Sequence, residues 1–313
     1  MKRIKDYLWP LAGLAAVCFS GWLLFQELKG ISADAVLDSL ADIPAHRWAL
    51  AVLSTFVAYG ALAWYDRIAL MHLGHKLGWG FISAVSFSTY ALSHNIGASV
   101  FSGAVVRYRA YSSKGLTAPE VGVLVALCSF TFGLGSVLLG SFVLLFEPEL
   151  MLALFDAPLW TARAIGGAML AGVGLYVVGS LLHFKPFHIG KFQIFYPRPA
   201  IVVRQLLAAP LELLGAAGII YFALPADAGV SFFAVAGAFV ASFSAALLSH
   251  APGGLGVLEY VFVKVLPTLD RADVVAALLV FRLLYLIVPL VFAIAMVVLF
   301  ERARLAETLR KPS

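Results

Sequence analysis

Three charged residues lie well inside stretches of mostly apolar sequence, where ionised groups are unusual. Glu212, Glu259 and Arg282 are each flanked by many aliphatic and aromatic residues, and Arg282 lies about 13 Å along a helix from the start of its stretch. Such a group costs at least a few kcal/mol and normally faces a cavity or an opposite charge. The guanidinium suits a phosphate or carboxylate, and the carboxyl groups suit charge balance or proton coupling. The alternative for Glu212 and Arg282 is a buried pair that only neutralises both charges.

Two other apolar stretches are interrupted in the middle by histidine, glycine and polar residues. Residues 81–106 contain the sequence SHNIGA at positions 93–98, and residues 230–266 contain SHAPGG at positions 249–254, so the matching residues are 156 apart. Proline and glycine end a helix in the second stretch, and a new helix then starts toward Glu259. The first N–H groups of a helix are unsatisfied and carry a partial positive charge, which makes this start a natural site for a phosphate or carboxylate.

These features define the candidate site. The expected substrate-binding residues are Asn95, Arg107, Ser249, His250, Gly253, Gly254, Glu259 and Arg282, and the expected residues for charge balance or coupling are Glu212, Glu259 and His94. Each type also has a structural explanation. The glycines suit close helix packing, Arg107 suits anchoring of a cytoplasmic loop, and the histidines suit hydrogen bonding within the interrupted segments.

Apolar helices must position these residues. A membrane-spanning helix needs about 20 mostly apolar residues, and six further stretches meet this requirement: residues 8–28, 48–70, 121–146, 162–184, 200–224 and 274–300. Hydrophobic residues make up 62% of the 313 residues and charged residues only 12%, whereas soluble domains carry about 25% charged residues. So few ions could not cover a soluble surface of this size. We therefore predict an all-α, polytopic membrane helical bundle rather than a soluble enzyme.

Lysine and arginine in the short loops predict the orientation of the bundle, because cytoplasmic loops are enriched in these residues. Basic residues precede the first span and follow the last, and acidic residues gather around 34–42 and 147–156. Both termini, including the tail 302–313, are therefore expected in the cytoplasm. The stretch 81–106 must then enter and leave from the cytoplasm, and the stretch 230–266 must enter and leave from outside.

Oppositely oriented hairpins at half-chain spacing are typical of an inverted-topology repeat. We predict one membrane domain, residues 1–301, with repeat halves of roughly 8–146 and 162–300. The domain would contain about six full spans and two re-entrant helical hairpins. The alternative is that each interrupted stretch forms two short helices that cross the membrane completely.

Motifs of soluble catalysis are missing from the sequence. It contains no GxxxxGK[ST] phosphate-binding loop, no HExxH and no GxSxG. Cys18 and Cys128 are isolated within apolar stretches and show no metal-ligand spacing. We expect no enzyme activity, no catalytic residues, no metal and no cofactor, so transport would be passive or driven by an ion gradient.

The sequence resembles the lysylphosphatidylglycerol synthase transmembrane region, or flippase-like, family of bacterial and archaeal membrane proteins. Residues 95–103 with Arg107, and the sequence SHAPGGLG at 249–256 with Glu259, carry the resemblance, and similar hydropathy extends it over about 8–300. In two-domain members of that family, such a module precedes a soluble aminoacyl-transferase domain. This chain stops thirteen residues after Phe300, so we expect the membrane module without the synthase half.

The resemblance implies translocation or handling of an amphipathic lipid, anionic or phosphate-bearing, between the leaflets of a cell (inner) membrane. Membrane lipids are the expected partners, a lipid-synthesis enzyme is a further candidate partner, and nucleic acid is not expected. Two other functions are alternatives. One is a small-solute or ion-coupled transporter of the same architecture. The other is a membrane-embedded enzyme or accessory subunit acting on a lipid precursor, with His94, His250 and Glu259 as candidate acid–base residues.

Overall fold

The chain is almost entirely helical in the residues that the structure, a computed structural model, describes. These are residues 32–96, 99–155, 157–182, 187–189, 192–194, 197–249 and 254–310. In chain order the elements are α2 (Ala33–Ala41), α3 (Ala45–Leu73), α4 (Trp79–Ile96), α5 (Ser99–Ser112), α6 (Ala118–Phe146), α7 (Glu149–Phe155), α8 (Leu159–Leu181), β1 (Phe187–Ile189), β2 (Phe192–Ile194), α9 (Pro199–Ala223), α10 (Phe232–Ser249), α11 (Val257–Val265), α12 (Arg271–Phe281), the π-helix η2 (Arg282–Ile287) and α13 (Val288–Arg310). The two strands form a short antiparallel hairpin between α8 and α9.

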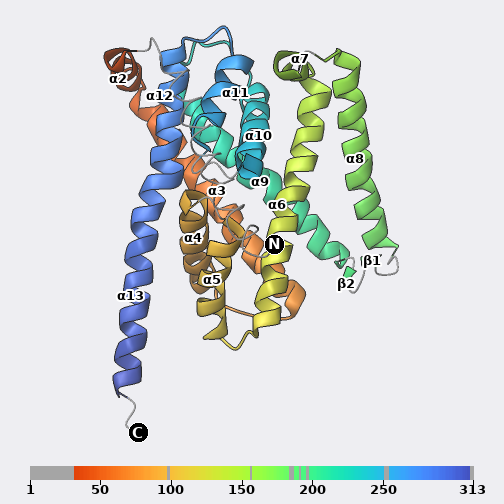
Figure 1. Cartoon of the computed structure of the whole chain (residues 1–313), viewed down its shortest axis with the longest axis vertical. Helices are drawn as coiled ribbons and strands as arrows, with labels where there is room; N and C mark the ends of the chain where they lie inside the picture. Colours follow the sequence, from red (N-terminus) through yellow and green to blue (C-terminus); the bar gives the residue numbers. More distant parts are fainter. Residues whose placement is uncertain are drawn as a thin grey trace, which may run out of the picture.

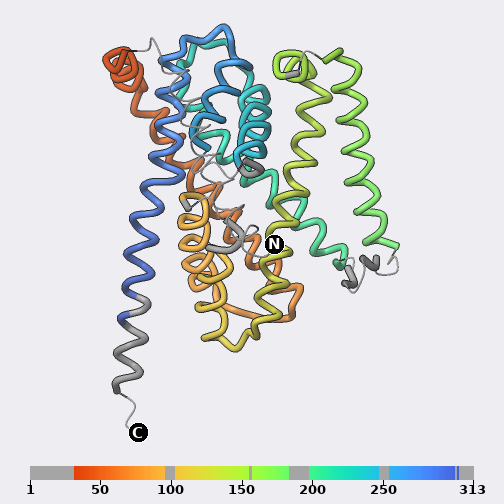
Figure 2. The backbone as a smooth tube through the Cα atoms, in the orientation of Figure 1, coloured from red at the N-terminus to blue at the C-terminus, as the bar shows by residue number. Residues whose placement is uncertain are grey.

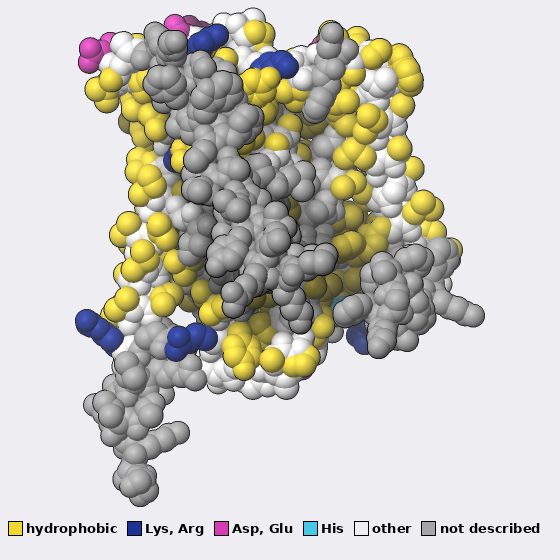
Figure 3. Space-filling model, in the orientation of Figure 1, with side chains coloured by type: hydrophobic (Ala, Val, Ile, Leu, Met, Phe, Trp, Pro, Cys, Tyr) yellow, Lys and Arg dark blue, Asp and Glu magenta, His cyan; other side chains and the backbone are white. Residues whose placement is uncertain are grey.

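Five helical segments are long and apolar enough to cross a membrane. They are α3, α6, α8, α9 and the continuous helix Arg271–Leu299, which runs through α12, η2 and the first part of α13. Each coincides with a predicted span, so the prediction of a polytopic helical membrane protein is confirmed. The predicted span 8–28 lies outside the described residues. In Figure 3 the flank between the two ends of the molecule is mostly apolar, and charged side chains gather near the ends.

Local sequence sets the ends of these helices. Before α6, the backbone N–H of Thr117 donates to Oε2 of Glu120 at 2.7 Å, which satisfies a free donor at the helix start. Helix α3 ends at Gly74, whose φ of 81° is a left-handed conformation that glycine adopts without strain. The end of α3 and the start of α6 lie at the same end of the molecule, with the hairpin of α4 and α5 between them (Figure 1).

The two interrupted stretches form helical hairpins at opposite ends of the molecule. Helix α4 packs against α5, and α10 packs against α11; Figure 1 shows the first hairpin in the lower half and the second in the upper half. The bends, residues 97–98 and 250–253, lie outside the described residues. Gly254 and Gly256 have φ values of 65° and 78°, so the chain enters α11 by a path that favours glycine. Entry of each hairpin from one membrane face stays a prediction.

The order of elements is the same in the two halves of the chain, and their direction is reversed. In the first half α3 is followed by the hairpin α4–α5 and by α6, and in the second half α9 is followed by the hairpin α10–α11 and by α12 (Figure 2). The equivalent helices α3 and α9 make the most extensive helix–helix contact in the described chain. Gly215 permits this approach, because a Cβ there would lie 2.8 Å from the backbone nitrogen of Ala58. This order and reversal agree with an inverted repeat, and the repeat halves of roughly 8–146 and 162–300 stay a prediction.

Candidate functional site

The last span contains a π-helical turn, η2, between α12 and α13. Such turns occur frequently at functional sites, and their altered hydrogen-bond pattern leaves backbone carbonyls for other donors. The hydroxyl of Tyr59 on α3 donates to the carbonyl of Tyr285 at 2.9 Å. The amide of Asn95, at the end of α4, donates to the carbonyl of Leu286 at 3.1 Å. Side chains from α3 and from the first hairpin thus hold the turn that begins with Arg282.

Arg282 forms an ion pair with Glu259 of the second hairpin. Nη1 of Arg282 lies 2.5 Å from Oε1 of Glu259, and the side chains are only 11% and 2% exposed. The other carboxylate oxygen of Glu259 accepts from the backbone N–H of Gly256 at 2.9 Å, so Glu259 also caps α11. This pairing corrects one alternative drawn from the sequence, in which Glu212 neutralises Arg282. It also shows that a carboxylate of the chain itself occupies part of the anion position at the start of α11.

Two donors of Arg282 are left over after this pairing. Its Nε and Nη2 are buried and have no hydrogen-bond partner among the described residues. Buried donors without a partner are rare in folded proteins, and each costs about 1–3 kcal/mol or more when charged. The guanidinium fork that remains matches two oxygens of a phosphate or carboxylate. Arg282 is therefore the residue of the described site that is best prepared to take an anion.

Glu212 contacts the same turn from α9, just after Pro210. Its side chain is buried, and the hydroxyl of Tyr285 donates to its Oε1 at 2.7 Å. The second carboxyl oxygen, Oε2, has no partner in the described part of the chain. A carboxyl held in this way has one oxygen fixed by a donor and one oxygen able to exchange a proton.

His94 joins the two hairpins through ring contacts. Its ring stacks on Tyr285 with centroids 5.2 Å apart and an angle of 20°, and it meets Phe243 of α10 edge to face at 5.9 Å. Its Nδ1 is buried without a hydrogen-bond partner in the region described. The expected hydrogen-bonding role of His94 within its own hairpin is therefore not seen at Nδ1, because the aromatic side chains around the imidazole leave it no acceptor.

A second buried ion pair ties the first hairpin to α3. Nε and Nη2 of Arg107 donate to the two oxygens of Asp66 at 3.2 and 2.7 Å, and the hydroxyl of Tyr111 donates to the same carboxylate at 2.7 Å. The guanidinium also lies 4.7 Å from the ring centroid of Tyr90. These contacts commit Arg107 to Asp66, so in this structure its Nε and Nη2 are occupied by protein rather than free for a head group.

The structure brings five of the ten sequence-predicted residues to one place. Arg282 is the first residue of η2. The residues that contact η2 are His94, Asn95, Glu212 and Glu259. Gly254 lies before α11, where a Cβ would collide with the side chain of Leu258. The side chain of Ser249 and all of His250 and Gly253 lie outside the described residues. No group of three or more His, Cys, Asp or Glu that could hold a metal is found among the residues described.

The sequence marks Asp66 as an ionisable group within an apolar stretch, but it did not predict that Asp66 pairs with Arg107 or that Tyr285 contacts Glu212. A weak signal existed for each. Arg107 and Tyr111 are one helical turn apart and can reach a common acceptor, and Asp66 is the one acidic residue of α3. Tyr285 follows Arg282 by three residues, which places both on neighbouring positions of one helix face.

Comparison with known proteins gives a consistent result over most of the chain. Residues 11–293 match the family described as the lysylphosphatidylglycerol synthase TM region. The protein slr0712 of Synechocystis is 32% identical over 268 residues, which cover 85% of this chain and 83% of that protein. The inner membrane protein YbhN of Escherichia coli is 28% identical over 254 residues, or 80% of this chain and 78% of that protein. A phosphatidylglycerol lysyltransferase of Staphylococcus aureus is 26% identical over 289 residues, 90% of this chain but 32% of that protein.

Proposed function

The chain belongs to the lysylphosphatidylglycerol synthase TM region family, and from this premise we propose that it translocates an anionic, phosphate-bearing lipid between the leaflets of an inner membrane. The names of two relatives support this proposal. One is called an inner membrane protein and the other a phosphatidylglycerol lysyltransferase, and the second covers this chain only with its membrane region. A protein of this family with several apolar spans is therefore expected to work on lipids within the membrane.

Two donors of Arg282, which have no partner among the described residues, carry the proposal. Nε and Nη2 of Arg282 are buried at the π-turn, and the partner that Nη1 has is a carboxylate on the second hairpin. A phosphodiester has two exposed anionic oxygens, which the guanidinium fork can bind together. An uncharged or purely cationic head group has no such oxygens and would leave the two donors unsatisfied.

Glu259 gives the site a way to respond to the head group. With Glu259 ionised, Arg282 is already neutralised, so an arriving phosphate adds one negative charge to a site of low dielectric. The carboxyl must then take up a proton or move away from Arg282. Movement of Glu259 also frees the N–H of Gly256 that it caps, which exposes the start of α11 to the anion.

The two buried ion pairs provide matching restraints on the two hairpins. Arg107 of the first hairpin is held by Asp66 of α3, and Glu259 of the second hairpin is held by Arg282 of the last span. Because the hairpins lie at opposite ends of the molecule (Figure 1), release of one pair would open one end while the other stays closed. This is the arrangement that alternating access between leaflets requires.

Translocation in proteoliposomes tests this function. Fluorescent phosphatidylglycerol, phosphatidylcholine and polyprenyl phosphate would be followed by impermeant quencher, with and without a pH gradient. We expect faster movement of phosphatidylglycerol, a monoanion, than of the zwitterionic phosphatidylcholine, and loss of this movement in Glu259→Gln. The matched control is Glu149→Gln, which changes an exposed glutamate of α7. Equal movement of all three lipids, or none by folded protein, would refute the proposal, and uptake of a soluble anion alone would support a solute transporter instead.

A further inference from the structure

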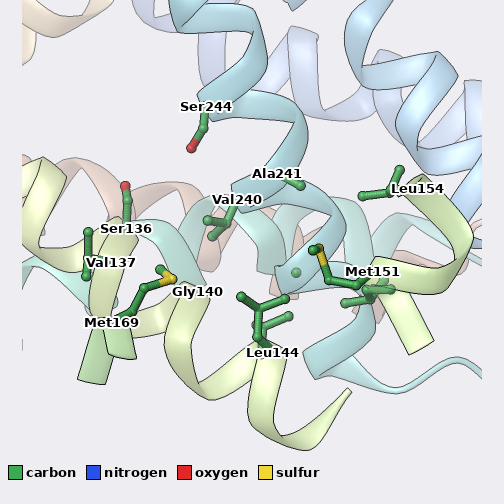
Figure 4. A pocket seen from close by; sticks show the side chains of 13 residues that line it. Ser136, Val137, Gly140, Leu144, Met151, Leu154, Met169, Val240, Ala241 and Ser244 are labelled. Atoms are coloured by element: carbon green, nitrogen blue, oxygen red, sulfur yellow. The ribbon is translucent and has the colours of Figure 1, made fainter. Parts of the chain in front are cut away.

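An apolar cavity lies apart from the π-turn, between α6, α7, α8 and α10. Its volume is about 300 Å³. Figure 4 shows Met151 and Leu154 of α7, Met169 of α8 and Val240 of α10 directed around one space. Helix α8, which forms one wall, packs mainly on α6 and lies on the flank of the bundle (Figure 1). The cavity is thus at the side of the molecule that faces lipid rather than in its centre.

The size and lining of the cavity fit hydrocarbon. Apolar cavities of about 150 Å³ hold a benzene ring and exclude water, so twice that volume has room for roughly ten to twelve methylene-sized carbons. Two methionines line the space, and their flexible side chains adapt to ligands of varied shape. In a membrane the abundant occupant of this chemistry is a lipid chain, since water gains nothing from such a lining.

One end of the cavity, whose lining is otherwise apolar, carries two serine side chains. The hydroxyls of Ser136 on α6 and Ser244 on α10 lie at the same end and point toward one another across the space (Figure 4). The Oγ of Ser136 is buried and has no hydrogen-bond partner among the described residues. A buried hydroxyl without a partner is a donor for a ligand oxygen.

The serine end lies toward the middle of the bundle. Ser136 is ten residues before the end of α6 and Ser244 is five residues before the end of α10, which puts Ser136 roughly 15 Å below the end that carries α7. The methionine and leucine side chains of α7 line the opposite end. A chain that enters from the middle would therefore run toward α7.

We infer that this cavity binds one acyl chain of a membrane lipid, with the ester carbonyl of that chain accepting a hydrogen bond from Ser136. The inference deepens the proposed function, because it selects acyl-ester lipids over polyprenyl phosphates, which have no ester carbonyl. It also assigns separate places to the two parts of the substrate. The proposed phosphate site is at Arg282, and the proposed chain site is the space between α6, α8 and α10.

Photo-crosslinking of the full chain in proteoliposomes tests the site. The probe is phosphatidylglycerol with a diazirine in the middle of one acyl chain, and adducts are located by mass spectrometry. We expect adducts in α7, around Met169 and around Val240. Ala241 lines the cavity, and the phenylalanine ring of Ala241→Phe would fill it. The acyl chain should then bind about tenfold more weakly, because it must displace or overpack the ring, and labelling should fall by the same factor. Ala245→Phe, on the same helix at an exposed position, should label as wild type does.

Two further variants keep the test decisive. Gly140→Leu also fills the space, because a Cβ there meets only the flexible end of Met169, at 3.2 Å; it replaces Ala241→Phe if that variant does not fold. Ser136→Ala should lower labelling by the ester probe about fivefold, in line with one hydrogen bond, and should not change labelling by an ether-linked probe of the same length.

The outcomes separate this site from the proposed function. Equal labelling of the filled variants and wild type, or adducts confined to outward faces of α8 and α13, would overturn the acyl-chain site. Equal sensitivity of ester and ether probes to Ser136→Ala would overturn the role of the carbonyl. Cavity labelling in a protein that translocates no lipid would refute the translocation proposal and leave this site standing.

Discussion

Removal of the Asp66 carboxylate should destabilise the protein strongly, because four donors depend on it, one of them the thiol of Cys128. Asp66 is fully buried, Arg107 is 4% exposed, and the carboxylate accepts from Nε and Nη2 of Arg107 and from the hydroxyl of Tyr111. In Asp66→Ala the guanidinium would stay in an apolar interior without its counter-charge. Breaking a buried pair from one side costs about 3–5 kcal/mol, and the unpaired hydroxyl of Tyr111 adds to it.

The same reasoning predicts a different result when both partners are replaced. In Asp66→Leu/Arg107→Met no charge remains buried, and such replacements are often close to neutral. The double variant should therefore be more stable than Asp66→Ala, with a coupling of at least about 2 kcal/mol between the two positions. Reversible unfolding of the protein in bicelles by SDS, followed by tyrosine and tryptophan fluorescence, measures both quantities.

A surface pair provides the control. His75 lies 3.0 Å from Glu120, and these side chains are 29% and 34% exposed, so His75→Ala should cost no more than about 1 kcal/mol. A loss of less than about 1 kcal/mol in Asp66→Ala, or equal losses in the single and double variants, would refute the claim that this pair holds the first hairpin.

Three further predictions follow from the same contacts. Tyr285→Phe removes the donor to Glu212 and should cost about 1–3 kcal/mol in the same unfolding assay; no change would mean that another donor reaches this carboxyl. Glu212→Gln keeps an acceptor for Tyr285 but cannot exchange a proton, so lipid translocation should no longer differ with and without a pH gradient. A retained response would remove this carboxyl from coupling. Gly215→Ala brings a Cβ within 2.8 Å of the nitrogen of Ala58 and should cost about 1–3 kcal/mol, whereas Gly172→Ala, with nothing within 4 Å, should be neutral or slightly stabilising.

The spans and the hairpins were predictable from the sequence because both depend on local composition. Uninterrupted apolar runs predict α3, α6, α8, α9 and the last span. A helix of about 20 apolar residues is long enough to cross the hydrocarbon layer, and it pairs its own backbone polar groups there. The breaks near residues 97 and 252 were marked by glycine or proline together with polar residues, whereas the isolated Pro210 lies inside α9. Loop charge then predicts that the two hairpins point in opposite directions.

The partners of the charged residues were harder to predict. Sequence alone shows that Glu212, Glu259 and Arg282 are buried, but the rotation of each helix decides which carboxylate faces the guanidinium. Here Arg282 meets Glu259, and Glu212 meets Tyr285. The π-turn has no signal in residues 282–287, whose composition suits an ordinary α-helix, and the cavity beside α8 arises from the fit of side chains on four helices.

The central claim is that Nε and Nη2 of Arg282, which have no partner in the part of the chain that the structure describes, bind the phosphate of a lipid during translocation. The most direct test compares Arg282→Gln with Arg271→Gln, which changes an exposed arginine at the start of α12, in the phosphatidylglycerol translocation assay. Loss of a charge-assisted, two-point contact should slow translocation by Arg282→Gln at least about tenfold and leave Arg271→Gln at the wild-type rate. A wild-type rate in folded Arg282→Gln would contradict the account.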